Sequence, residues 1–390
     1  MSGGVDSSVA AYLLKEQGYD VVGVFIMGYN VDGCAERDAE DARRVAGYLD
    51  IPFYVFDFGK EYKKKVVEYM IDGYRKGITP NPDVICNKEI KFGLFLEKAR
   101  EMGADYIATG HYVRLRNTKK YEYTKTKAWS NSYIRNQFVF RSMYQAKDKN
   151  KDQSYFLWTL TQEQLKYCLF PIGEYTKPRV RGIARNAGLP TAEKKDSQGI
   201  CFLGQVSIKD FLKEYIPTHE GAVVTADGMR VGTHEGAEFY TIGQRHGLNL
   251  GIKNKELGIT GKMETKAHYV AEKDVKHNTI MVAEGDNNPL LEKKEVIITN
   301  VNFITATPHE DDLKRGVTVY ARIRYRQPLV EATLIATDGK KTRADRYQHQ
   351  SASSASISVK FSKPIKFVAP GQSAVFYSKK GRVLGGGVII

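Results

Sequence analysis

Residues 2–8 read Ser-Gly-Gly-Val-Asp-Ser-Ser and lead directly into an apolar helical segment. Gly3 and Gly4 lack a Cβ atom, so backbone N–H groups there can close around an anion, and the serines add hydroxyl donors. The helix predicted for 9–15, with Gly18 as its stop, points the positive end of its dipole at the same place. No Gly-Lys-Ser/Thr follows the glycines, so this is not a Walker loop. A Gly-Gly pair alone is usually a turn, but the whole string before a helix predicts a nucleotide site.

The loop resembles the PP-loop of ATP pyrophosphatases, which bind ATP and release pyrophosphate while they adenylate a substrate. Such a loop normally follows a buried strand of about five or six apolar residues. Here only Met1 precedes Ser2. We therefore expect the native chain to start upstream of Met1, and mass spectrometry of the native N-terminus would test this.

The length and charge of the chain limit the class of protein. With 390 residues the chain can form two or three domains with their own cores. The balance of 59 Lys and Arg against 45 Asp and Glu, a formal charge of +14, favours a polyanionic partner, although a basic cytosolic enzyme would also fit. No apolar run reaches the length of a membrane span, so we expect no membrane and a cytoplasmic location.

The four cysteines are too scattered for a disulfide scaffold or a Cys-x-x-Cys zinc site; they are Cys34, Cys86, Cys168 and Cys201. We expect reduced thiols and no metal held by protein ligands alone.

The first half of the chain alternates strand and helix patterns. Strands are predicted at 20–27, 53–56 and 106–109, and helices at 36–49, 61–74 and 88–101. This rhythm predicts an α/β fold with a parallel sheet, whose ligand site lies at the carboxyl ends of the strands.

The rest of the chain changes character twice. Residues 118–150 show no clear period and predict an exposed insertion or a long hairpin, followed by helices at 162–168 and 177–187. After about residue 205 short strands alternate with Gly-rich turns, and from 267 onward, beginning with strands at 268–271 and 279–282, the pattern is almost entirely β, which suggests a barrel. The predicted domains are an N-terminal PP-loop domain (adenine nucleotide alpha hydrolase-like) at 1–204, a small β-rich central domain at 205–266 and a C-terminal β-barrel at 267–390.

Two cysteines lie in settings that favour a reactive thiol. Cys86 follows a Pro-stiffened segment and precedes Asn87, a predicted N-cap for a helix from Lys88; a helix N-terminus and a nearby lysine both lower a thiol pKa. Cys201 lies in a Gly-flanked segment behind Lys194 and Lys195.

These two thiols have open alternatives. Cys86 can equally be a buried small residue, and the spacing does not prove that it meets Cys201, although the pair could exchange a disulfide. Cys168 falls in an apolar helical stripe and is interpreted as structural, and Cys34 has no comparable setting.

Together these strings resemble the tRNA-specific 2-thiouridylases over nearly the whole chain. The similarity is carried by the PP-loop and by segments 81–92, 108–112, 151–157, 196–202, 241–245, 324–327 and 370–377. The insertion around 118–147 is longer than the family pattern, and 252–266 lacks its compact Gly-rich form. A PP-loop suits many enzymes, but both cysteine strings in order make the similarity specific.

The resemblance implies ATP-dependent 2-thiolation of the wobble uridine in Lys, Glu and Gln tRNAs. The uracil 2-oxygen would be adenylated, Cys201 would carry sulfur as a persulfide, and Cys86 would be the nucleophile that resolves it, releasing sulfide or leaving a disulfide. Asp83 is implied as a catalytic residue that, with Asn81 and Pro82, contacts the target base. The sulfur donor would be a cysteine desulfurase, acting directly or through a sulfur-relay protein.

The resemblance also assigns binding residues. The ATP contacts are Ser2, Gly3, Gly4, Val5, Asp6, Ser7, Ser8, Ile26 and Gly110, with Mg²⁺ held largely by phosphate oxygens and water. The tRNA contacts are Asn81, Pro82, Asp83, Lys151, Asp152, Gln153, Arg324 and Tyr325, with His111 and Gln372 in tRNA selection. Taken alone, His111 would more often be a packed or capping residue, and Arg324–Arg326 a solvated strand face. A base taken out of an anticodon loop requires a pocket, which we expect between domains.

Three rival interpretations remain. Another PP-loop enzyme, such as an amidotransferase-coupled synthetase or a different tRNA thiolase, would not need the paired cysteines. A catalytically inactive relative without the first strand would bind tRNA but not hydrolyse ATP. A simple basic RNA-binding protein is disfavoured, because it would leave two thiol motifs without a role.

Overall fold

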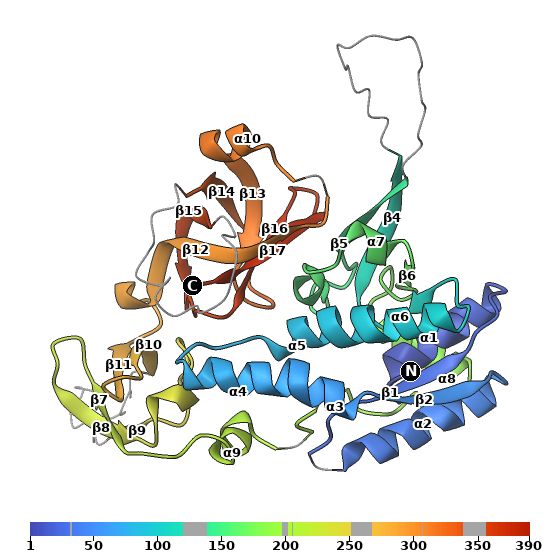
Figure 1. Ribbon diagram of the computed structural model, residues 1–390, viewed down its shortest axis with the longest axis horizontal. Coiled ribbons are helices and arrows are strands. Elements are labelled where there is room, and N and C mark those ends of the chain that lie inside the picture. The colour runs from blue at the N-terminus through green and yellow to red at the C-terminus, as the bar shows by residue number, and fades with distance from the viewer. Residues whose placement is uncertain are drawn as a thin grey trace, which may run out of the picture.

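The structure, a computed structural model, describes residues 1–31, 33–119, 139–196, 202–204, 206–250, 267–305, 307–337 and 356–390. Figure 1 shows a helix-rich N-terminal part, a small sheet and a barrel, with two long helical rods running between them. The predicted order of an α/β part, a β-rich part and a barrel is confirmed.

The parallel strands of the N-terminal part form two separate pairs. β1 (Gly23–Met27) pairs in parallel with β2 (Phe53–Asp57), and β3 (Ile107–Ala108) pairs in parallel with β6 (Cys168–Leu169). The prediction of parallel strands is confirmed, but they are not joined into one sheet in the described residues. The amino group of Met1 lies along β1 and donates a hydrogen bond to the carbonyl oxygen of Val24.

Three helices pack around one apolar cluster beside these strands; they are α1 (Val5–Glu16), α2 (Cys34–Tyr48) and α8 (Lys177–Asn186). Val9 of α1 meets Val45 of α2 and Val180 of α8, and each of these side chains is fully buried. α1 ends before Gly18, whose φ of +82° suits a glycine, as the sequence predicts. The PP-loop therefore leads into a helix that is buried on several sides.

Two helical rods run side by side across the molecule (Figure 1). The first consists of α3 (Gly59–Tyr62), the π-helical segment η1 (Lys63–Val67) and α4 (Glu68–Arg75). The second consists of α5 (Pro82–Ile85), the π-helical segment η2 (Cys86–Leu94) and α6 (Phe95–Glu101).

The second rod begins earlier than predicted. Asn81 caps it, since its side-chain oxygen accepts a hydrogen bond from the backbone N–H of Val84 (3.3 Å), and Pro82 takes the first helical position. The prediction that Asn87 caps a helix from Lys88 is wrong. Asn87 lies inside the rod, where its Nδ2 donates to the carbonyl oxygen of Phe156 (3.2 Å).

The predicted insertion begins and ends as a hairpin. β4 (Val113–Lys119) and β5 (Val139–Gln145) pair antiparallel, while 120–138 lie outside the described residues. Two short helical segments follow, the 3₁₀ turn η3 (Ser154–Leu157) and α7 (Gln162–Leu165). The helix predicted to reach Cys168 stops earlier, because Cys168 pairs with Ile107 as the first residue of β6.

The central part is one five-stranded sheet in the order β10-β11-β7-β8-β9. The five strands of this sheet are β7 (Gly221–Val224), β8 (Arg230–His234), β9 (Asn249–Leu250), β10 (His268–Asp274) and β11 (Thr279–Glu284). The central part also contains the helix α9 (Ile208–Lys213) and the 3₁₀ turn η4 (Ala237–Phe239).

The assignment of the strands at 268–271 and 279–282 to the barrel is wrong. They lie in β10 and β11, and β11 pairs in parallel with β7. A boundary at residue 266 would therefore divide a sheet that the structure joins. Alternation identifies a strand but not its sheet, and burial of Val270 and Ile280 against Val223 decides it.

The predicted barrel is confirmed as a closed sheet in the order β12-β15-β14-β13-β16-β17. Its elements are the 3₁₀ turn η5 (Pro289–Leu291), β12 (Glu292–Phe303), α10 (Glu310–Arg315), β13 (Val317–Arg322), β14 (Val330–Ala336), β15 (Ile357–Lys366), β16 (Ser373–Tyr377) and β17 (Val383–Ile389). Closure leaves none of its strands as a free edge.

The three parts share their apolar cores. One cluster joins Met70 of α4 to Val223 and Ile280 of the central sheet, and another joins Trp158 of the N-terminal part to Val375 of the barrel. Within the described residues no helix is long and apolar enough to cross a membrane. The shared cores set the parts at defined positions around the rods that carry the predicted site.

Candidate active site at the PP-loop and the Cys86 helix

The PP-loop turns sharply into the start of α1. Gly3 has a φ of +68°, and Gly4 caps α1, so the N–H groups of the first turn have no partner within the helix. The hydroxyl groups of Ser7 and Ser8 both donate to the carbonyl oxygen of Gly4, at 3.1 and 2.9 Å. Ser2 lies against Ser7, with their hydroxyl oxygens 3.2 Å apart.

Other segments press closely on this loop. A Cβ atom on Gly110 would lie 2.7 Å from the backbone nitrogen of Ser7 and 2.8 Å from the carbonyl carbon of Asp6. A Cβ atom on Gly3 would collide with the backbone oxygen of Asp38 in α2. The structure therefore brings Gly110 and the PP-loop together. Ile26, the other residue outside the loop that is implied to contact ATP, lies in the carboxyl half of β1. At positions 3 and 110, any residue other than glycine would therefore force the neighbouring backbone to shift.

A network of ion pairs lies behind the loop. Lys177, at the start of α8, has its Nζ atom 2.8 Å from both carboxylate oxygens of Asp6 and 2.8 Å from Oδ1 of Asp196. Asp196 also pairs with Lys151 and Arg181, each at 2.6 Å. Burial raises the pKa of Asp196, but the hydrogen bonds from Lys151 and Lys177 outweigh it and lower the pKa to about 2.

Cys86 lies where the second rod changes to the wider π-helical register. Its backbone N–H donates to the carbonyl oxygen of Pro82, so it lies one turn inside the helix and not beside a free N-terminus. The predicted activation by a helix N-terminus therefore does not apply to Cys86. Departures from the α register are frequent at functional sites, which keeps this position a candidate.

The residue that follows Cys201 in the sequence lies in the same apolar cluster as Cys86. Cys201 lies outside the described residues, but Phe202 is buried in the same apolar cluster as Cys86 and packs edge-on against Tyr62, with ring centroids 5.7 Å apart. The chain on the other side of Cys201 is held at Asp196 by the network behind the PP-loop. Among the residues that the structure describes, Cys86 and Cys168 are not joined to each other by a disulfide.

Asp83 and His111 both lie near Lys91. Burial raises the pKa of Asp83, and the charge of Lys91 opposes that rise. Burial, together with Lys91, holds the pKa of His111 well below its usual value. The His111 ring packs against the rings of Phe92 and Phe170, and its Nδ1 is 2.8 Å from the hydroxyl oxygen of Thr109. His111 is thus a packed, neutral histidine, in agreement with the alternative stated for it.

The barrel supports the segment that holds Asn81, Pro82 and Asp83. The side-chain nitrogen of Gln372 donates to the carbonyl oxygen of Thr79 (2.8 Å). The backbone N–H of Thr79 donates to the carbonyl oxygen of Pro370 (2.8 Å). The Thr79 hydroxyl meets that of Thr241 from the central part at 3.2 Å. All three parts of the molecule therefore meet two residues ahead of Asn81.

The residues predicted to contact tRNA have internal partners. Asp152 is 1% exposed and pairs with Arg322 of the barrel at 2.6 Å. Lys151 binds Asp196, and Oε1 of Gln153 accepts the backbone N–H of Tyr112 at 3.0 Å. The structure therefore places this segment as a brace between the PP-loop network and the barrel.

Arg324 and Tyr325 lie at the junction of the barrel with the other parts. Arg324 donates from Nη2 to the carbonyl oxygen of Ile242, and burial lowers its pKa. The ring of Tyr325 lies 4.7 Å from that of Phe156, centroid to centroid, and Arg326 covers it at 5.1 Å.

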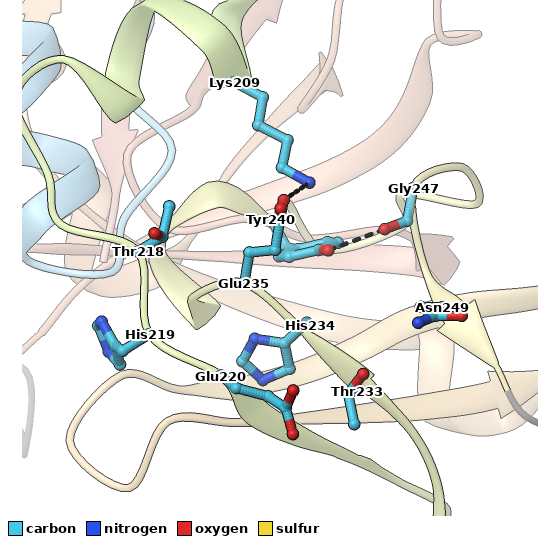
Figure 2. A pocket seen from close by; sticks show the side chains of 10 residues that line it. All are labelled: Lys209, Thr218, His219, Glu220, Thr233, His234, Glu235, Tyr240, Gly247 and Asn249. Carbon is cyan, nitrogen blue, oxygen red and sulfur yellow. Dashed lines mark hydrogen bonds and ion pairs between the residues drawn. The ribbon is translucent and has the colours of Figure 1, made fainter.

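A cavity of about 410 Å³ lies elsewhere, in the central part (Figure 2). It is lined by Lys209, Thr218, His219, Glu220, Thr233, His234, Glu235, Tyr240, Gly247 and Asn249, and the Tyr240 hydroxyl donates to the carbonyl oxygen of Gly247 at 2.8 Å. No predicted site residue lines it, so we place the chemistry at the PP-loop. The described residues contain no cluster of His, Cys, Asp or Glu suited to a metal ion.

Two residues of the site were not predicted. Lys177 lies 171 positions from Asp6, and Thr191, whose hydroxyl donates to that of Ser8 at 2.9 Å, lies 183 positions away. The sequence held one signal for Lys177: it is a lysine at the start of a predicted helix, where the helix dipole disfavours a cation, so a nearby anion is expected.

Comparison with known proteins agrees with this arrangement. A family model described as the tRNA methyl transferase HUP domain matches residues 1–205. A model described as the tRNA methyl transferase PRC-barrel domain matches 209–284, and one described as the aminomethyltransferase beta-barrel domain matches 293–389. The chain is thus a three-domain protein with a HUP nucleotide-binding domain at its N-terminus, and the second match contains β10 and β11.

Curated relatives define the family. A protein named tRNA-specific 2-thiouridylase MnmA from Lactobacillus gasseri is 43% identical over 100% of this chain and 93% of its own length. A protein named tRNA-specific 2-thiouridylase MnmA 1 from Geobacillus kaustophilus is 44% identical over 97% of this chain and 90% of its own length. A protein named tRNA-specific 2-thiouridylase MnmA from Lactococcus lactis is 42% identical over 100% of this chain and 93% of its own length. The chain belongs to the MnmA family of tRNA-specific 2-thiouridylases.

Proposed function

We propose that this chain is an ATP-dependent enzyme that replaces the 2-oxygen of the wobble uridine in tRNA with sulfur. One observation carries the proposal. The chain on one side of Cys201 is tied through Asp196 and Lys177 to the PP-loop, and the chain on the other side is buried at Phe202 with Cys86. This arrangement supports a sulfur carrier that lies between an ATP site and a second thiol.

The reaction requires activation of a poor leaving group. The uracil 2-oxygen attacks the α-phosphate of ATP, and pyrophosphate leaves. The terminal sulfur of a Cys201 persulfide attacks the uracil C2 atom, and AMP leaves with the oxygen. The Cys86 thiolate then attacks the Cys201 sulfur, which reduces the transferred sulfur and leaves a Cys86–Cys201 disulfide for an external thiol to reduce.

We propose that Asp83 donates or accepts a proton beside the target base. Burial raises the pKa of Asp83, so this carboxyl group keeps its proton to a higher pH than an exposed aspartate does. Asn81 and Pro82 fix the start of its helix, and Gln372 holds the preceding backbone. We propose that Gln372 influences tRNA choice through this support, since it joins the barrel to the segment near the base.

The PP-loop residues fit a triphosphate. The first turn of α1 offers backbone N–H groups that have no partner within the helix. The Ser7 and Ser8 hydroxyls donate to the carbonyl oxygen of Gly4 and so hold the loop in shape. We propose that Mg²⁺ enters with ATP and is bound mainly by phosphate oxygens and water.

The proposed partners follow from the chemistry. The excess of basic residues suits tRNA, and a persulfide on Cys201 requires a sulfur donor such as a cysteine desulfurase or a relay protein. We propose Lys, Glu and Gln tRNAs as substrates, in a cytoplasm that keeps these thiols reduced.

The test is thiolation of unmodified glutamate tRNA by the purified chain with Mg²⁺, ATP and a persulfide or sulfide donor. We expect 2-thiouridine, detected by mass spectrometry of digested tRNA, only when ATP is present. Cys86→Ala should abolish thiolation but keep tRNA-dependent release of pyrophosphate. Binding of tRNA without any pyrophosphate release or product would favour an inactive binder and reject the proposal.

A further inference from the structure

We propose that Lys177 is a positioning residue that neutralises Asp6 in the ATP-binding loop and shares its charge with Asp196, ahead of Cys201. The inference rests on the proposed function, because it assigns a role in ATP binding. Lys177 belongs to none of the segments that carried the family resemblance.

The geometry places Lys177 as a bridge. It is 8% exposed, and its Nζ atom lies 2.8 Å from both oxygens of Asp6 and 2.8 Å from Oδ1 of Asp196. The ring of Tyr112 lies 6.0 Å from the same ammonium group, and the Tyr112 hydroxyl donates to Asp6 Oδ1 at 2.7 Å. A buried ammonium group with three carboxylate oxygens around it is strongly held.

The two carboxylates differ in how they are neutralised. Asp196 has Lys151 and Arg181 in addition to Lys177, each at 2.6 Å. Within the described part of the chain, Lys177 is the one cation paired with Asp6. Asp148 also faces this region, where its Oδ2 accepts the backbone N–H of Lys177 at 2.9 Å. Loss of Lys177 would therefore leave Asp6 unneutralised, while Asp196 would keep two partners.

The charge of Asp6 matters because of its position. Asp6 lies in the first turn of α1, where N–H groups and the helix dipole attract the phosphates of a nucleotide. An unneutralised carboxylate at that point repels a triphosphate. Lys177 therefore favours ATP binding by cancelling the charge of Asp6.

The segment that ends at Asp196 packs against the PP-loop and α2. The Thr191 hydroxyl donates to Ser8, and Lys194 pairs with Asp38 (2.7 Å) and Asp41 (2.6 Å) of α2. Loss of the Asp196 charge would release the end of this segment. It would also leave Lys177 wholly to Asp6, so ATP binding would not weaken.

Substitutions at Lys177 and at Asp196 should therefore change different kinetic constants. Lys177→Met should raise the KM for ATP and the Kd for Mg·ATP about 10-fold to 100-fold, with kcat at saturating ATP nearly unchanged. Asp196→Asn should leave the Kd for Mg·ATP within about threefold and lower kcat for thiolation about tenfold or more. Lys177→Arg should restore most of the ATP affinity, because it keeps the charge.

The experiment measures Mg·ATP binding by calorimetry and thiolation kinetics on the full-length chain. Arg185→Met is the matched control: Arg185 lies on the same helix in an exposed pair with Glu193, and both constants should stay within about twofold. Equal ATP affinity in wild type and Lys177→Met would overturn the inference.

Weaker ATP binding in Asp196→Asn would also overturn it, and this variant decides the matter if Lys177→Met fails to fold. A wild-type chain that does not bind Mg·ATP at all would instead reject the proposed function.

Discussion

Cys86 and Cys168 carry the same thiol in different surroundings, Cys86 in the second helical rod and Cys168 in β6. Both are buried, but Cys168 lies in the core beside β3, where its thiol donates to the carbonyl oxygen of Gln164 at 3.1 Å. Burial raises the pKa of Cys168 to about 12, although the charge of Arg141 opposes that rise. Its thiolate fraction at pH 8 is then on the order of 10⁻⁴, so Cys168 is a structural residue.

We expect Cys168→Ala to leave the thiolation rate within about twofold, at a stability cost of roughly 1 kcal/mol for lost packing. Cys86→Ala should lower the rate to background. Mass spectrometry after iodoacetamide treatment should find Cys168 unmodified at pH 8, with labelling that increases as pH approaches 12. Rapid labelling of Cys168 in the folded protein at pH 8 would contradict its assignment.

At the scale of single elements, the starts of two helices and the close packing of Gly110 against α1 shape the site. Asn81 and Pro82 start the rod that carries Cys86, and Gly4 starts the helix that completes the PP-loop. Gly110 matters for a different reason: the backbone of the first turn of α1 occupies the space that its Cβ atom would need. The site therefore depends on main-chain packing as much as on side chains.

Gly110→Ala should displace the first turn of α1, because the new Cβ atom would lie 2.7 Å from the backbone nitrogen of Ser7. We expect the KM for ATP to rise at least about tenfold. Gly182→Ala in α8 is the control, since its Cβ atom meets nothing within 4 Å; it should leave the KM unchanged and stabilise the helix by about 0.5–1 kcal/mol. An unchanged KM in Gly110→Ala would show that this contact does not shape the ATP site.

At the scale of the whole molecule, a buried ion pair joins the N-terminal part to the barrel. Asp152 and Arg322 are 1% and 5% exposed, and Arg322 also lies over the ring of Tyr377 at 4.7 Å. Asp152 accepts further hydrogen bonds from Gln145 and from the backbone of Ala146 and Ser154. This pair fixes the segment that also presents Lys151 to Asp196.

Arg322→Met should therefore destabilise the protein by about 3–5 kcal/mol, because it leaves the charge of Asp152 buried and unpaired. The double variant Asp152→Asn with Arg322→Met should recover part of this loss. Denaturant unfolding followed by near-ultraviolet circular dichroism measures both. A double variant no more stable than Arg322→Met would show that the unpaired charge is not the cause.

Local sequence patterns were sufficient to predict much of the fold. The glycines and serines of residues 2–8 predicted the loop before α1, and alternation near the C-terminus predicted the closed barrel. The irregular stretch after 118 predicted an exposed insertion or a long hairpin, and its two described ends pair as a hairpin. These features depend on neighbours in sequence, because backbone freedom and side-chain period act over a few residues. The two cysteine strings, read in order, also identified the family.

Other features depend on contacts between distant residues. Alternation could not show that β10 and β11 join the central sheet, and the sequence suggested Asn87 as a helix cap although Asn81 has that role. Asp152 was expected to contact tRNA, but its burial against Arg322 follows from the docking of two domains.

The sequence by itself determined the loop and the order of the elements, since both are encoded by residue type and local spacing. Only the tertiary structure decided which charges neutralise one another, because Lys177 meets Asp6 across 171 residues and loses its exposure to water in doing so. Burial makes such a pairing strong, and burial is a property of the folded chain.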